Sequence, residues 1–296
     1  MLGTCFSIQM RQPLAYCLIG LGLLVAGCDS GAKLGPAESS EAATQAAGLP
    51  GSVGARPVDP RFTQSFAEAT RADPPADFQR PPDLTLTGKS VGKLYSDLVA
   101  LWPTIQLTTP DGKLIPYVAT METEVGTVEI ILRPDLAPNH VRNFIALSML
   151  GYYDGLVFER TVRAKPADHP EQEVEVLEGG CPLGTGDIGI GSLGYWLKPE
   201  YSQETHDVGT MGAPRGADPD SACCRFYMTL SKAPFLDGNF TIFGKVTTGL
   251  DVAKRIFSLP VRNDNEYPEG DRPEKPVVIR KVTIAVAGAS GEESVR

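Results

Sequence analysis

The alternation of apolar and polar residues from position 117 onward predicts a domain built mainly of short strands. Residues 117–122 and 127–132 alternate on either side of Gly126, which is typical of a β-hairpin. Further strand-like runs occupy residues 157–162, 173–177, 226–230, 241–246 and 277–286. This part of the chain is long enough for one domain with its own hydrophobic core.

Two helical segments interrupt the strand pattern. Pro138 suits the first turn of a helix that places Val141, Phe144 and Ile145 on one face, and Gly151 stands where such a helix ends. A second helix is expected to start near Leu250. Many antiparallel strands with two helices fit a closed barrel, because closure removes exposed sheet edges. The fold class is therefore expected to be mainly β.

A separate amphipathic helix is predicted ahead of this domain. Ser90 suits an N-cap, Pro103 suits a stop, and the residues between them bring apolar side chains to one face at helical spacing. These apolar residues are Val91, Leu94, Tyr95, Leu98, Val99 and Trp102. Residues 61–115 are interpreted as an N-terminal extension whose helix packs on the following domain. The alternative is a helix that binds a partner protein.

The N-terminus has the pattern of an export signal. Met10 and Arg11 precede an apolar run at residues 14–25, which is too short for a membrane span and suits a signal peptide. The run ends in V-A-G-C, which resembles a bacterial lipobox with Cys28 as the lipidated residue. We expect residues 1–27 to be a lipoprotein signal peptide and the mature protein to be membrane-anchored, extracytoplasmic and on the periplasmic side. An ordinary signal peptide with an incidental cysteine is the alternative, and translation from Met10 is compatible with both.

Composition divides the remaining chain. Residues 28–60 are rich in Gly, Ala, Ser, Glu and Pro, so they bury too little apolar surface to offset their chain entropy and are predicted to be a disordered tether. A folded domain is expected at residues 116–288, followed by a disordered tail at 289–296.

Charge and motif content exclude several classes of function. The chain has 36 acidic and 27 basic residues and a net charge of -9, which gives no electrostatic footprint for nucleic acid. His140, His169 and His206 lack metal-ligand spacing, so no metal site is predicted. The glycine-rich run at 179–194 lacks the Lys-Ser/Thr of a phosphate loop. No cofactor is expected.

Two segments resemble cyclophilin-type peptidyl-prolyl isomerases. The stretch TVEIILRPDLAPNHVRNFIALSMLGYYDGLVFER, which ends at Arg160, is similar to the family's opening. The stretch PFLDGNFTIFGKV matches the family's W-L-D-G-x-H-T-V-F-G-x-V segment, with Phe235 and Phe240 in place of Trp and His. The resemblance implies a closed, eight-stranded antiparallel barrel capped by two helices, and proline-containing polypeptides as binding partners.

The chemistry of the family assigns a role to Arg160. An X-Pro bond rotates across a barrier of about 18 to 20 kcal/mol because its amide C–N bond has double-bond character. A donor to the twisted amide lowers that barrier, and arginine supplies fixed, permanently charged donors. The resemblance places Arg160, which closes F-E-R, at the family's catalytic arginine. The alternative is an ordinary surface arginine on a strand.

The resemblance also implies a substrate pocket with several changed residues. Tyr227, Leu236 and Phe235 would form its apolar walls. The family segment F-M-x-Q-G-G-D appears here as E-V-L-E-G-G-C, so Val176 and Glu178 replace Met and Gln, and Glu175 replaces Phe. Further along, Arg225 replaces the Gln before F-F, and Phe240 replaces the pocket His. We expect Glu178 and Arg225 to pair with each other across the site.

The cysteines of the folded part suggest a redox feature. Cys5 and Cys17 lie in the signal and Cys28 is assigned to lipid, which leaves Cys181, Cys223 and Cys224. An exported protein meets oxidising conditions. The resemblance places the two cysteine-bearing segments side by side, so a bridge from Cys181 to Cys223 or Cys224 is a candidate. The alternative is three small buried residues.

Two classes of function follow. The first is an extracytoplasmic prolyl isomerase that assists the folding of exported proteins, which retention of Arg160 favours. The second is a cyclophilin-like peptide-binding module that keeps the groove without useful catalysis.

Overall fold

The computed structural model describes residues 59–76, 78–165, 173–187, 189, 191–262 and 272–287. The expected signal peptide, the lipidation site Cys28, the C-terminal tail and all but the last two residues of the expected tether lie outside these ranges.

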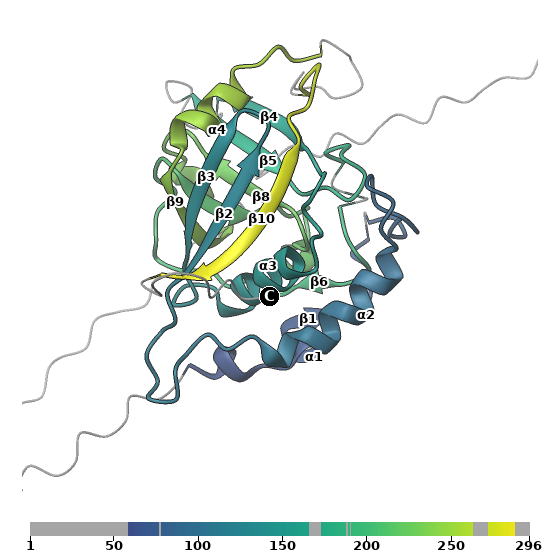
Figure 1. The fold of residues 1–296 in the computed structure, drawn as a ribbon, viewed down its shortest axis with the longest axis vertical. Coiled ribbons are helices and arrows are strands. Elements are labelled where there is room, and N and C mark those ends of the chain that lie inside the picture. The colour runs from purple at the N-terminus through teal and green to yellow at the C-terminus, as the bar shows by residue number, and fades with distance from the viewer. Residues whose placement is uncertain are drawn as a thin grey trace, which may run out of the picture.

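Eight antiparallel strands form one curled sheet (Figure 1). The strands are β2 (Tyr117–Thr123), β3 (Gly126–Leu132), β4 (Phe158–Ala164), β5 (Val174–Gly179), β7 (Thr210–Ala213), β8 (Phe226–Thr229), β9 (Thr241–Thr248) and β10 (Ile279–Val286). Their order across the sheet is β10-β2-β3-β9-β7-β8-β5-β4. The predicted hairpin is confirmed, because β2 and β3 pair from Val118–Ile131 to Thr123–Gly126.

The expected closure of the barrel is wrong. Strands β10 and β4 are the two edges of the sheet, and among the described residues they meet only near their starts, through the bridge Val157–Val278 and neighbouring hydrogen bonds. In one of these bonds the Phe158 N–H donates to the Val277 carbonyl at 3.0 Å. Just after this contact β10 shifts register against β2 between Ile279 and Lys281. Such a bulge bends a strand, and the sheet remains a half-barrel.

Two helices pack against the sheet where the sequence predicts them. Helix α3 (Pro138–Met149) lies against β9 and β10, and α4 (Leu250–Phe257) lies against β3 and β5. Gly249 precedes α4 with φ +81°, and a Cβ there would stand 2.1 Å from the Thr127 carbonyl oxygen, so only glycine fits this close approach. The strand alternation buries Ala119, Met121, Val128 and Ile130 in the core beneath these helices.

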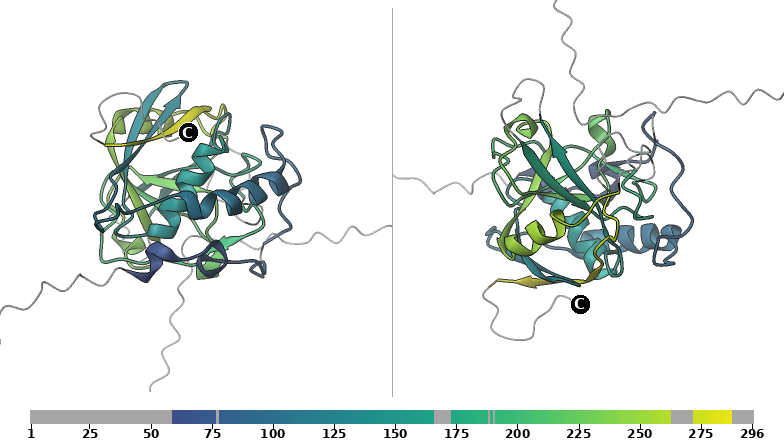
Figure 2. Two further views of the ribbon diagram at one scale, coloured as in Figure 1. Left: turned by 60° about the horizontal axis from the view of Figure 1, so that its bottom comes forward. Right: turned by 90° about the horizontal axis from the view of Figure 1, so that it is seen from above.

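The N-terminal extension packs on the domain, as expected. It contains α1 (Phe66–Ala69), β1 (Thr70–Arg71) and α2 (Val91–Leu101), and the Ser90 side chain accepts from the Lys93 N–H at the start of α2. Strand β1 pairs with β6 (Trp196–Leu197), and α2 runs beside α3 (Figure 2). Leu98 and Trp102 are buried in the same hydrophobic core as α3. The extension and the half-barrel therefore share one core.

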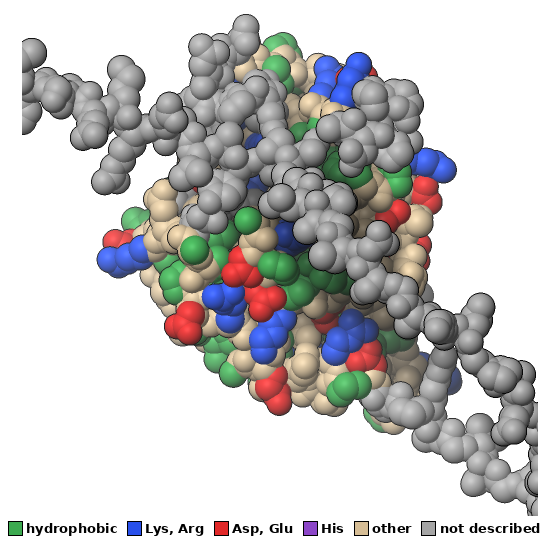
Figure 3. Space-filling view, turned by 180° about the vertical axis from the view of Figure 1, so that it is seen from behind, with side chains coloured by type: hydrophobic (Ala, Val, Ile, Leu, Met, Phe, Trp, Pro, Cys, Tyr) green, Lys and Arg blue, Asp and Glu red, His purple; other side chains and the backbone are tan. Residues whose placement is uncertain are grey.

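The described surface carries both signs of charge. On the face in Figure 3, Lys and Arg side chains stand among Asp and Glu side chains. Within the described ranges, no helix combines the length and the apolar character that a membrane crossing requires.

Candidate active site

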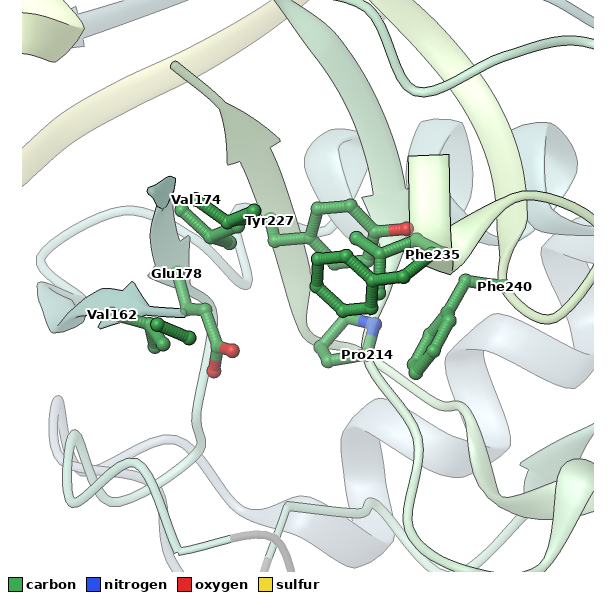
Figure 4. Close-up of a pocket in the computed structure, with 10 residues that line it drawn as sticks. Val162, Val174, Glu178, Pro214, Tyr227, Phe235 and Phe240 are labelled. Atoms are coloured by element: carbon green, nitrogen blue, oxygen red, sulfur yellow. The ribbon is translucent and has the colours of Figure 1, made fainter. Parts of the chain in front are cut away.

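An apolar pocket opens beside strands β4, β5 and β8 (Figure 4). Its lining consists of Val162, Ala164, Val174, Val176, Glu178, Pro214, Tyr227, Phe235, Leu236 and Phe240. Most of these side chains form a second hydrophobic cluster, distinct from the main core. A concave apolar surface with a small number of polar groups is the usual form of a ligand site.

Strand geometry explains which residues face this pocket. Successive side chains on a strand point to opposite faces, so Val174, Val176 and Glu178 of β5 share the pocket face. Leu177 points to the other side and lies in the main core. Glu175 also lies off the pocket face, where its carboxylate is 3.5 Å from the Arg163 guanidinium.

The opposite wall is a short turn of 3-10 helix, Pro234–Leu236, and the loop that follows it. Phe235 and Leu236 come from this turn, and Phe240 meets the ring of Tyr227 edge-on with centroids 6.3 Å apart. The Arg215 guanidinium covers the ring of Phe240 at 4.7 Å. The predicted pocket residues Val176, Glu178, Tyr227, Phe235, Leu236 and Phe240 are thus brought together in one lining.

The lining includes four residues that the sequence reasoning missed: Val162, Ala164, Val174 and Pro214. Three of them carry a detectable signal. Val162 and Ala164 follow Arg160 at strand spacing of two, and Val174 precedes Val176 by two. Pro214 comes from the segment after β7 and carries no such signal.

Glu178 is the charged residue of the pocket lining, and two arginines bind it. The Arg225 Nη2 donates to Glu178 Oε2 at 2.5 Å, which confirms the expected pair. The Arg160 Nη1 lies 3.4 Å from both carboxylate oxygens. The strand register explains the meeting, because Arg160 on β4 is the direct partner of Glu178 on β5. Arg225 lies outside the lining of the apolar pocket and contacts it through Glu178.

A buried acid completes this charged group. Glu159 accepts from the Arg225 Nε at 3.3 Å and from the Cys181 N–H at 3.1 Å. Burial raises the pKa of Glu159 to about 7, the positive charge of Arg225 opposes that rise, and the negative charge of Glu178 adds to it. Glu159, Glu178, Arg160 and Arg225 form what we call the charged cluster. Glu159 has no signal in the sequence, because the burial of a strand residue depends on which segments cover it.

Arg160 is held along its length. Its side chain is 14% exposed, and its aliphatic part lies against Gly186, where a Cβ would come within 2.6 Å of Arg160 Cγ. Gly186 also has φ +71°, which favours glycine. A fixed guanidinium at the rim of an apolar pocket can donate to a polar group of a bound chain while the pocket holds an apolar ring.

The structure does not contain the candidate disulfide. Cys181, Cys223 and Cys224 are buried free thiols in the structure. Each sulfur has a separate neighbour: Cys181 Sγ lies 3.6 Å from Thr185 Oγ1, Cys223 Sγ accepts from the Leu193 N–H at 3.3 Å, and Cys224 Sγ lies 3.5 Å from the Gly191 carbonyl oxygen. Burial raises the pKa of Cys181 and Cys224, which disfavours reactive thiolates. The three residues instead fill space in the interior.

Comparisons with known proteins match the sheet and the pocket. The family model for the cyclophilin type peptidyl-prolyl cis-trans isomerase/CLD matches residues 118–284. A peptidyl-prolyl cis-trans isomerase of Schizosaccharomyces pombe is 35% identical over 162 residues, which cover 54% of this chain and 94% of that protein. The peptidyl-prolyl cis-trans isomerase-like 3 of Gallus gallus is 32% identical over 166 residues, covering 56% and 94%.

A solved structure shows a weaker likeness. The cyclophilin type isomerase of Cryptosporidium parvum has a TM-score of 0.47 and 24% identity, covering 58% of this chain and 98% of that one. The family model spans more than half of the chain and includes every residue of the pocket lining and of the charged cluster. The chain therefore belongs to the cyclophilin-type peptidyl-prolyl cis-trans isomerases.

Proposed function

We propose that the protein isomerises X-Pro bonds of exported polypeptides, with the proline ring in the apolar pocket and Arg160 as the donor that stabilises the twisted amide. The observation that carries this proposal is the contact of Arg160 with Glu178. Glu178 lines the pocket, so its contact with Arg160 puts the guanidinium at the pocket's edge.

The geometry supports catalysis without a covalent step. As the amide twists, its nitrogen loses conjugation and gains a lone pair that can accept a hydrogen bond. A preorganised donor then stabilises the twisted state more than the planar one. The pocket contributes by holding the proline ring while the rest of the chain rotates. No proton transfer or cofactor takes part in this scheme.

Glu178 has a positioning role in the proposal. A carboxylate that accepts from two guanidinium groups fixes both, because charge-assisted hydrogen bonds are stronger than neutral ones. Its negative charge also offsets one of the two positive charges beside the apolar pocket. We therefore expect the cluster to attract acidic residues next to the substrate proline less than two unpaired arginines would.

The same contact supports a second candidate function. The Arg160 guanidinium lies close to Glu178, and a carboxylate competes with a substrate amide for its donors. Strong competition would leave a peptide-binding module with weak catalysis. The two candidates share the pocket and differ in what Arg160 does.

The proposed location is extracytoplasmic and membrane-anchored, on the periplasmic side, with a lipid on Cys28. It rests on the apolar run at residues 14–25 and the V-A-G-C sequence that ends at Cys28. The glycine- and alanine-rich residues that follow would give the domain reach toward newly exported chains.

Exchange spectroscopy on a proline peptide tests the function directly. Catalytic amounts of the protein should speed cis–trans exchange of an Ala-Pro peptide well above its uncatalysed rate, which has a time constant of roughly 10 to 100 s. Saturable peptide binding with an unchanged exchange rate would instead support the binding module. If the protein neither binds the peptide nor speeds its exchange, both candidates are refuted.

A further inference from the structure

A second polar chain lies behind the pocket, apart from the charged cluster. The His206 Nδ1 is 2.7 Å from Asp237 Oδ1, and the His206 Nε2 is 2.7 Å from the Tyr227 hydroxyl oxygen. The His206 backbone N–H also donates to Asp237 Oδ1 at 2.7 Å. The imidazole is fully buried, whereas the Asp237 side chain keeps contact with solvent.

The chemistry of the three groups fixes the direction of the hydrogen bonds. An ionised carboxylate only accepts, so the hydrogen of the imidazole stands on Nδ1 and points at Asp237. The Nε2 of a neutral ring then accepts, and the Tyr227 O–H donates to it. Burial lowers the pKa of His206, although the bond to Asp237 opposes this, and the neutral ring is favoured. The hydrogen bonds therefore run in series, from the Tyr227 hydroxyl to His206 and from His206 to Asp237.

The tyrosine end of the chain is the floor of the pocket. Figure 4 shows the phenol ring running from β8 toward the turn that carries Phe235. The ring lies directly on β7, because a Cβ added to Gly212 would stand 2.3 Å from the Tyr227 hydroxyl oxygen. Gly212 is also the register partner of Tyr227. Because Gly212 has no side chain, the Tyr227 ring can cross this position and its hydroxyl can reach His206.

The aspartate end of the chain is the wall of the pocket. Asp237 directly follows Leu236, and the loop then leads to Phe240, whose ring meets that of Tyr227. The His206 carbonyl accepts from the Ala233 N–H at 2.9 Å, at the other end of the same turn. His206 therefore contacts the wall turn at both ends and the floor at the tyrosine hydroxyl.

We propose that His206 is a positioning residue of the proline pocket, which sets the spacing between the floor residue Tyr227 and the wall turn Pro234–Leu236 through its bonds to Tyr227 and Asp237. This inference rests on the proposed function of the pocket as the proline site. It adds a residue outside the lining and assigns the tyrosine hydroxyl a purpose that a phenylalanine could not serve.

A double-mutant cycle on peptide affinity tests this linkage. The variants are Tyr227→Phe, which keeps the ring, Asp237→Ala, which removes the acceptor, and the two combined. We expect each single change to weaken the binding of an Ala-Pro peptide about fivefold, the value of one net hydrogen bond. The double variant should also be about fivefold weaker, because breaking the chain at either end releases the same constraint. Asp237→Asn, which keeps an acceptor oxygen, should restore most of the affinity.

The control is Asp207→Ala. Asp207 follows His206 in the sequence, and its exposed carboxylate pairs with Lys232 at 3.4 Å. This variant should leave the affinity unchanged and add nothing to Tyr227→Phe. Effects of Tyr227→Phe and Asp237→Ala that multiply to about 25-fold would overturn the proposal. So would variants that lower the thermal midpoint and leave the affinity intact, because this would make the chain purely structural. Affinity is measured by peptide titration and does not depend on catalysis. Absence of isomerase activity in the unmodified protein would therefore refute the proposed function without deciding this proposal.

Discussion

Glu178 is the residue on which the pocket and the charged cluster depend. It lines the apolar pocket and accepts from Arg225 at 2.5 Å while Arg160 lies 3.4 Å away. Behind it, Glu159 is a buried second acid with a pKa raised to about 7. With both acids ionised, the cluster has two negative and two positive charges. Protonation of Glu159 leaves it with a net positive charge beside the pocket.

The raised pKa of Glu159 predicts a specific pH dependence of stability. The acid has a pKa of about 7 in the folded protein and 4.5 as a free group, so between these values only the folded state retains the proton. Raising the pH therefore lowers the free energy of unfolding, by about 3 kcal/mol in total, or 1.36 kcal/mol per pKa unit.

Urea unfolding at pH 5 and pH 8 measures this effect. Glu159→Gln keeps an acceptor oxygen and removes the titration, so its stability should fall less than that of the unmodified protein between the two pH values. Comparison of the two proteins cancels the other titrating groups. Equal changes in both proteins would mean that Glu159 has an ordinary pKa.

The sequence predicted which residues line the pocket better than it predicted the contacts that these residues make. The matching family segment pointed to Val176 and Glu178, and opposite charges pointed to the pair with Arg225. The hydrogen bond from Tyr227 to His206 was beyond reach, since it joins a strand to a loop residue through three-dimensional contact. The buried thiols show the same limit, because neighbouring segments do not determine where each sulfur points.

Among the elements, helix α3 starts without a side-chain cap of its own. Its N-cap residue is Ala137, which has no side-chain acceptor for the free N–H groups of the first turn. Glu200 replaces the missing cap from a distant loop. Its carboxylate accepts from the Asn139 N–H at 3.2 Å and the His140 N–H at 2.9 Å, and it lies 2.8 Å from His140 Nδ1. Negative charge at this end also suits the helix dipole.

Loss of this cap should destabilise the protein measurably. We expect Glu200→Ala to lower the free energy of unfolding by about 2 kcal/mol, because the caps and charges of a buried helix start each contribute on that order. Urea denaturation gives the value. The control is Glu204→Ala, which removes an exposed carboxylate 3.7 Å from Arg133. A similar loss in both variants would argue against capping.

Element types were predictable and closure was not. Periodicity identified the hairpin, α2 and α3, because these segments have regular apolar spacing. Strand β7 was missed, since its Met211-Gly212-Ala213 run is buried throughout and shows no alternation. The open edges of the half-barrel have no local signature, because closure depends on pairing between β4 and β10, which lie far apart in the sequence.

At the scale of the whole molecule, the extension and the half-barrel form one unit. Trp102 of the extension donates from Nε1 to the Gln64 carbonyl oxygen at 3.1 Å, and the Arg142 guanidinium of α3 covers its ring at 5.2 Å. Arg71 of the extension also pairs with Asp218 at 2.7 Å. The extension is therefore in contact with α3 and with the segment that carries Asp218, although the family model begins only at residue 118.

The proposed lipid anchor is a prediction about the whole molecule. Cys28→Ser should release the protein from membranes into the soluble extracytoplasmic fraction, because a multiply acylated cysteine holds far more firmly than a single chain. Fractionation of cells that produce the two proteins measures the difference. Removal of the unmodified protein by mild salt would show that its attachment is electrostatic and would exclude the anchor.

The most direct test of the central claim compares Arg160→Ala with Arg163→Ala in an isomerase assay. Arg163 lies on the same strand, pairs with Glu175 and has a side chain that is 58% exposed, so it controls for loss of a β4 arginine. Loss of one preorganised donor should lower kcat/KM by about 100-fold or more in Arg160→Ala. Arg163→Ala should stay close to the unmodified protein, and both should still bind an Ala-Pro peptide. Equal activity of Arg160→Ala and the unmodified protein would contradict the assignment of Arg160 as the catalytic donor.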